Sequence, residues 1–111
     1  TIPFNVSRVQ CRNGWPGFTE KQGWRIKKSP IHYYKMIYAD TAVCDNRAAM
    51  RLGYDFFGPD KIVFGTDYPF GPEQGEAHIR QAIDVVEQEA IPEEDRKKIF
   101  EENARRLLKI R

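Results

Sequence analysis

Two aspartates end apolar runs of the sequence, where a carboxylate can bind a divalent metal or move a proton. Asp40 ends the run 35–40, and Asp67 ends the run 62–67. In parallel α/β barrels the active site lies at the carboxyl ends of the strands, so both acids are candidates for chemistry. Each could instead only cap the turn that follows it, and the spacing leaves both interpretations open.

Both runs lack the apolar–polar alternation of a half-exposed strand, which predicts strands covered on both faces. Tyr68 and Pro69 follow Asp67 directly and turn the chain out of its strand. The two acids are 27 residues apart, which is one strand–helix unit of ordinary length. Parallel strands therefore position the candidate carboxylates.

Three helices are predicted around these strands. The first spans about 46–57, with Asp45 as its cap and Gly58-Pro59 as its stop. The second spans about 76–89, and its apolar positions share one face: Ile79, Ala82, Ile83, Val86 and Ala90. Pro92 opens the third at its first position, with an apolar stripe of Ile99, Phe100, Ala104, Leu107 and Leu108. This order of elements predicts a parallel α/β fold.

Size and composition restrict the function further. The chain has 111 residues, whereas a complete eight-unit barrel needs roughly 250. Two parallel strands leave unpaired edges, so we expect a fragment of a longer protein. The net charge of +2 does not favour nucleic acid, and no apolar run reaches the length of a membrane span. Cys11 and Cys44 form no disulfide framework, and we expect reduced thiols in a cytoplasmic protein.

The remaining features are predicted to be structural. Residues 1–9 are interpreted as a loop entering a short helix, and 10–30 as a long irregular lid or subunit contact. His32 and His78 are expected in a loop and on an exposed helix face, not as metal ligands. Cys44 is expected to be a packed thiol. The charged run 93–98 is expected to form a solvated helix face.

The string from Gly58 to Phe70 resembles the last barrel strand of the amidohydrolase superfamily, in the branch that contains aminocarboxymuconate semialdehyde decarboxylase and the resorcylate and carboxyvanillate decarboxylases. Segments 38–41, 103–108 and 1–8 are similar to its seventh strand, its closing helix and the segment after its sixth strand. The resemblance implies the C-terminal part of a TIM (β/α)8 barrel. Residues 1–34 would be the post-strand-six segment and long loop, and 35–111 the last two strand–helix units and closing helix.

The resemblance also implies site residues. Asp67 matches the eighth-strand aspartate, a metal ligand that takes part in proton transfer, and Arg8 matches an arginine that binds the substrate carboxylate. The metal would be zinc or manganese, the substrate a small carboxylic acid, and the protein a homo-oligomer. The metal-binding histidines of the family's first, fifth and sixth strands have no match here, so this chain alone is expected to be inactive.

Three functions stay open at this point. The first is a non-oxidative decarboxylase acting on an aromatic or unsaturated carboxylic acid. The second is a metal-dependent hydrolase on the same scaffold. The third is a non-enzymatic α/β fragment that acts by protein–protein contact through its exposed strand edges.

Overall fold

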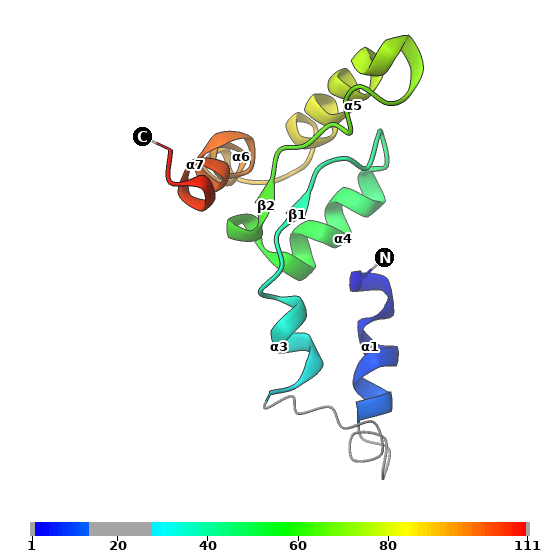
Figure 1. Ribbon diagram of the computed structural model, residues 1–111, viewed down its shortest axis with the longest axis vertical. Helices are drawn as coiled ribbons and strands as arrows, with labels where there is room; N and C mark the ends of the chain where they lie inside the picture. Colours follow the sequence, from blue (N-terminus) through cyan, green and yellow to red (C-terminus); the bar gives the residue numbers. More distant parts are fainter. Residues whose placement is uncertain (1, 14–27, 111) are drawn as a thin grey trace. The chain divides into compact units, whose positions relative to one another are not determined.

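The computed structural model describes residues 2–13 and 28–110, which fall into two compact units, Thr1–Ile37 and Tyr38–Arg111 (Figure 1). The first unit contains helix α1 (Ile2–Asn13) packed against the short helix α3 (Pro30–Tyr34). None of the helices in the described ranges is both long and apolar enough for a membrane crossing.

Residues 1–9 were predicted to be a loop that enters a short helix, but helix α1 begins already at Ile2 and is longer than predicted. Pro3 lies in the first turn, where a backbone N–H has no partner within the helix, so proline does no harm there. Ile2, Val6 and Val9 recur at helical spacing and are partly buried. Of the irregular stretch predicted at 10–30, residues 10–13 continue the helix and 14–27 lie outside the described residues.

The second unit is built on two parallel strands, β1 (Ala39–Asp40) and β2 (Ile62–Val63), with Ala39 opposite Ile62 and Asp40 opposite Val63. Helix α4 (Arg47–Phe57) and a 3-10 turn at Pro59–Lys61 connect them. The predicted parallel pairing is therefore confirmed.

Both strands are shorter than predicted. The run 35–40 was expected to be a strand, but the backbone N–H groups of Lys35, Met36 and Ile37 donate to carbonyls three or four residues back, at 3.0–3.2 Å. Those local bonds use the donors that a strand would offer to a neighbour. Strand β2 ends at Val63, although the sequence predicts extension to Asp67.

Helix α4 begins one residue later than its predicted cap implies. Asn46, and not Asp45, caps it: the Asn46 side-chain oxygen accepts a hydrogen bond from Ala49 N at 3.0 Å. At the other end Gly58 adopts φ +78°, which stops the helix as predicted.

Three further helices complete the unit: α5 (Glu76–Glu87), α6 (Glu93–Lys97) and α7 (Asn103–Leu108), with a π-helical turn at Lys98–Glu102 between the last two. Pro92 lies just before α6, one position earlier than predicted. Helices α4 and α7 both pack against β2 (Figure 1). The buried core consists of Met50, Ile62, Val85, Val86, Ile91 and Ile99. Leu107 and Leu108 were expected in the apolar stripe but are 47% and 65% exposed.

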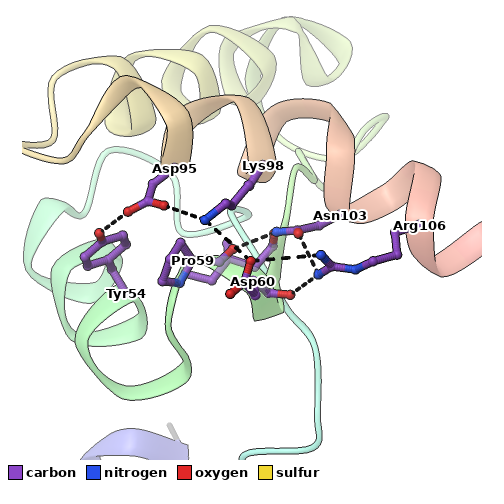
Figure 2. A network of polar contacts seen from close by, with 8 residues as sticks. Tyr54, Pro59, Asp60, Asp95, Lys98, Asn103 and Arg106 are labelled. Atoms are coloured by element: carbon purple, nitrogen blue, oxygen red, sulfur yellow. Dashed lines mark hydrogen bonds and ion pairs between the residues drawn. The ribbon is translucent and has the colours of Figure 1, made fainter.

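A polar cluster ties the start of β2 to the C-terminal helices, and we call it the anchor network (Figure 2). It consists of the side chains of Tyr54, Asp60, Asp95, Lys98, Asn103 and Arg106. Asn103 is fully buried, and its amide nitrogen donates to the carbonyls of Pro59 (2.6 Å) and Ile62 (2.8 Å). Its amide oxygen accepts from Arg106 at 2.9 Å. The side chain therefore holds the backbone on either side of the residues that lead into β2.

Asp95 corrects the prediction that the charged run 93–98 is a solvated face. Its carboxylate is 7% exposed, accepts a hydrogen bond from the Tyr54 hydroxyl at 2.6 Å and pairs with Lys98 at 3.0 Å. The bond from Tyr54 lowers the pKa of Asp95 below its usual range, and the same bond raises the pKa of Tyr54. Contact with Asp95 also raises the pKa of Lys98.

Candidate functional site

The residues at the carboxyl ends of β1 and β2 form what we call the strand-end site: Asp40 and Thr41 at the end of β1, and Gly65, Thr66 and Asp67 after β2. Parallel strands run in one direction, so their carboxyl ends meet at one edge of the sheet. Both acids predicted as candidates belong to this site, and the structure gives their side chains different surroundings.

Thr41 joins the two strand ends. It is fully buried, its hydroxyl donates to the Gly65 carbonyl at 2.8 Å, and the same oxygen accepts from Gly65 N at 3.0 Å. Gly65 also lies against Asp40: a Cβ added to it would be 3.1 Å from the Asp40 Cβ, which is tighter than ordinary van der Waals contact. Neither Thr41 nor Gly65 was predicted from the sequence as a site residue. A threonine directly after an apolar run is the only local signal, and its partner is 24 residues away.

Asp40 uses its carboxylate locally. Its Oδ1 accepts a hydrogen bond from Ala42 N at 3.0 Å, which is the turn-capping arrangement of an aspartate that ends a strand. Of the two interpretations left open for Asp40, the structure supports the turn cap.

Asp67 is arranged differently. It is exposed, adopts a left-handed backbone conformation with φ +61°, and only its carbonyl is used in a turn, accepting from Phe70 N at 3.0 Å. The neighbouring Thr66 hydroxyl accepts from Tyr68 N at 3.2 Å and so caps the turn in place of Asp67. Within the described part of the chain the Asp67 carboxylate makes no hydrogen bond or ion pair. It is available to a ligand.

The loop that follows Asp67 packs against helix α5. Gly75 is buried with φ +95°, and a Cβ there would lie 2.8 Å from the Pro69 backbone. The ring of His78 lies over Gly71, where an added Cβ would be 2.3 Å away. His78 was predicted on an exposed helix face, but it is half-buried because it covers this glycine.

The remaining candidate residues are divided between the two units. Arg8 is exposed on α1, in the unit Thr1–Ile37, whereas Asp67 belongs to Tyr38–Arg111. His32 is exposed, with its Nε2 3.1 Å from Lys28 Nζ. Cys44 is a free, exposed thiol at φ +54° in the turn after β1, which corrects the prediction of a packed thiol.

The Asp67 carboxylate suits one position in the coordination shell of Mn²⁺ or Zn²⁺, because both metals accept carboxylate oxygen. Across residues 2–13 and 28–110, no three or more His, Cys, Asp and Glu side chains gather as a metal site. Asp67 therefore fits as a single ligand, and a complete site needs ligands from beyond these residues.

Comparison with known proteins identifies the family. The family model described as amidohydrolase matches residues 14–110. The chain belongs to the amidohydrolase family. More narrowly, this amidohydrolase belongs to the branch that contains aminocarboxymuconate semialdehyde decarboxylase and the resorcylate decarboxylases.

The relatives of this amidohydrolase are named as decarboxylases. A gamma-resorcylate decarboxylase from Polaromonas sp. (strain JS666) is 31% identical over 98% of this chain and 31% of that protein. A structure of 2,6-dihydroxybenzoate decarboxylase complexed with 2,6-dihydroxybenzoate superimposes with TM-score 0.76 at 28% identity, covering 98% of this chain and 32% of that one. A dihydroxybenzoic acid decarboxylase from Polaromonas sp. JS666, with bound manganese and the inhibitor 2-nitroresorcinol, gives TM-score 0.76 at 31% identity, covering 98% and 31%.

The amidohydrolase chain thus spans about a third of the length of the relatives that it matches. Its fold is a partial α/β arrangement shared with these decarboxylases.

Proposed function

We propose that this amidohydrolase chain is the C-terminal part of a metal-dependent, non-oxidative decarboxylase of aromatic carboxylic acids. In this proposal β1 and β2 are barrel strands seven and eight, α7 is the closing helix, and residues 1–34 follow strand six. The names of the relatives favour a decarboxylase over the hydrolase alternative. Within residues 2–13 and 28–110 the sheet has two strands with unpaired outer edges, which agrees with a position inside a larger barrel.

The difference between the two strand-end acids carries the assignment of Asp67. Asp40 Oδ1 is held by its own turn at 3.0 Å, whereas the Asp67 carboxylate is exposed and makes no bond within the described ranges. Asp67 also keeps a left-handed conformation, which costs free energy in residues other than glycine and is typical of functional sites. We therefore assign Asp67 as a metal ligand and as a carrier of the transferred proton.

In this proposal the chain itself supplies few of the groups that the reaction needs. A bound divalent metal would supply positive charge that orients the substrate and stabilises the charge that develops on it. The Asp67 carboxyl group would deliver a proton to the ring carbon that bears the carboxylate. The bond between that carbon and the carboxylate then breaks, its electron pair restores the aromatic ring, and CO₂ leaves.

Arg8 is proposed to bind the substrate carboxylate. A guanidinium group forms two parallel charge-assisted bonds to a carboxylate, and Arg8 is exposed on α1. A homo-oligomer remains part of this proposal, as predicted from the sequence. The isolated chain is expected to be inactive, because one carboxylate is not a complete metal site.

The test compares the two acids in the complete natural polypeptide that carries this sequence, loaded with Mn²⁺ and assayed for CO₂ release from 2,6-dihydroxybenzoate. Asp67→Asn is expected to lower kcat at least ~100-fold, because it removes both a ligand and the proton carrier. Asp40→Asn is the matched control and should retain turnover, since an amide oxygen still accepts the bond from Ala42 N. In the same assay Arg8→Lys should raise KM more than it lowers kcat.

Wild-type turnover in Asp67→Asn would refute the assignment of Asp67. Turnover of esters or amides that depends on Asp67, without CO₂ release from any hydroxybenzoate, would establish the hydrolase alternative instead.

A further inference from the structure

The strands of this chain stop pairing before they reach the acid that carries the proposed chemistry. The last paired residues are Asp40 and Val63, which leaves three residues between the ladder and Asp67 without strand pairing. An unpaired strand end is free to fray, whereas a metal ligand has to be held in place. A structure other than the ladder must therefore fix the end of β2.

Thr41 supplies that connection. One hydroxyl can donate one hydrogen bond and accept two, and Thr41 uses both capacities on a single residue, donating to Gly65 O at 2.8 Å and accepting from Gly65 N at 3.0 Å. The side chain thus replaces the two backbone bonds that another ladder step would provide. Because Thr41 is fully buried, its own hydroxyl has no contact with solvent that could compete with these two bonds.

The fixed residue lies two positions before Asp67. On the side of β1 there is little free space beside Gly65, since a Cβ built on it would lie 3.1 Å from the Asp40 Cβ. The intervening Thr66 caps the next turn through Tyr68 N at 3.2 Å, and the Asp67 carbonyl closes the turn with Phe70 N at 3.0 Å. Gly65, Thr66 and Asp67 therefore each take part in at least one hydrogen bond.

We propose that Thr41 is a positioning residue: its hydroxyl, clamped on both backbone groups of Gly65, holds the end of β2 so that the Asp67 carboxylate is presented in one orientation to a divalent metal. This inference rests on the proposed function of Asp67. It predicts that removing the hydroxyl weakens metal binding without touching any ligand.

The experiment measures the Kd for Mn²⁺ by titration of the electron paramagnetic resonance signal in the complete natural polypeptide. Thr41→Val keeps the branched shape but leaves both Gly65 groups unpaired, and we expect its Kd to rise about 10-fold, as for other groups that orient a metal ligand. Thr41→Ser keeps the hydroxyl and should stay within about twofold of the wild type. Tyr54→Phe, in the anchor network, controls for a loss of stability that leaves the strand ends intact.

Gly65→Ala tests the same connection from the other strand. Its added Cβ presses on Asp40 at 3.1 Å while Thr41 keeps its hydroxyl, and the Kd for Mn²⁺ should again rise. This variant carries the test if Thr41→Val does not fold. If neither variant folds, the connection serves folding alone and the positioning role is refuted.

Asp67→Asn distinguishes a failure of the proposed role of Thr41 from a failure of the proposed role of Asp67. Lost Mn²⁺ binding in Asp67→Asn, together with a wild-type Kd in a folded Thr41→Val, would refute the positioning role and leave the proposed function standing. A wild-type Kd in Asp67→Asn would refute the assignment of Asp67 as a metal ligand and this inference with it.

Discussion

Polar side chains at the two ends of strand β2 differ in how fully they are hydrogen-bonded. At its start, the anchor network pairs every polar side chain with another group, and Asn103 alone holds two carbonyls and one guanidinium. At the strand-end site, Asp67 is exposed, adopts a left-handed conformation and keeps its carboxylate unbonded within the described residues. A saturated network stabilises a fold, whereas an unbonded carboxylate leaves a group available for a ligand.

Thr41 connects the end of β1 to the segment that follows β2. Its bonds make the strand-end site rigid up to Gly65, only two residues before the acid. The change from hydrogen-bonded to unbonded polar groups therefore occurs between Gly65 and Asp67. Substitutions in the anchor network should cost stability, whereas substitution of the exposed Asp67 should cost less stability but more function.

The largest loss of stability is expected from Asn103→Ala. The change leaves two carbonyls without their donor and opens a cavity in the core, which together cost about 2–4 kcal/mol. Urea denaturation of the complete natural polypeptide, followed by circular dichroism, measures the free energy of unfolding. Glu102→Ala, at the exposed neighbouring position, is the control and should change it by less than ~0.5 kcal/mol. Equal losses in the two variants would contradict the role of Asn103.

A smaller and pH-dependent loss is expected from Tyr54→Phe, which removes the 2.6 Å bond to Asp95 and should cost about 1–2 kcal/mol at pH 7. The folded-state pKa of Asp95 lies below its ordinary value, so its contribution is present above about pH 4 and is lost as the pH falls through the lowered pKa. The pKa of Tyr54 is raised, so its contribution is present below about pH 10 and is lost as the pH rises through the raised pKa.

The difference between wild type and Tyr54→Phe should therefore shrink below about pH 4 in urea denaturation. Tyr38→Phe is the matched control, because it removes a hydroxyl but keeps the ring that lies 4.1 Å from Lys61 Nζ. A pH-independent difference would show that Asp95 is not the group that Tyr54 stabilises.

The sequence predicts elements far better than it predicts connections between them. Helix α4, the parallel order of the strands and the stop at Gly58 follow from apolar spacing and local backbone preference, and they were predicted correctly. The bonds from Thr41 to Gly65 and from Asn103 to Ile62 join residues 24 and 41 positions apart. No local pattern encodes such pairs, so the residues that fix the strand ends were not predicted.

The strand-end site itself was predicted in part. Both acids were placed at strand ends, and the resemblance assigned a role to Asp67 alone; the structure adds that Asp40 is held by its own turn. Asp95 shows the reverse case: it was expected on a solvated face, but a tyrosine 41 positions away buries it. Burial of an acid by a distant partner cannot be read from its neighbours in the sequence.

The smallest effect is expected where the chain leaves the strand-end site and enters helix α4. Asn46→Ala removes the bond from Ala49 N at 3.0 Å and should cost about 1 kcal/mol, the usual value for a lost helix cap. Asp45→Ala is the matched control, because Asp45 is exposed and only its backbone carbonyl takes part, accepting from Arg47 N at 3.0 Å. It should cost no more than a few tenths of a kcal/mol.

The same urea denaturation measures both variants, and the Mn²⁺ Kd should be unchanged in each, since neither alters the bonds of Thr41. A larger loss of unfolding free energy in Asp45→Ala than in Asn46→Ala would show that Asp45 is the cap, as predicted from the sequence. A raised Kd in Asn46→Ala would extend the positioning of Asp67 beyond Thr41 to the start of α4, and the strand-end site would then include this helix terminus.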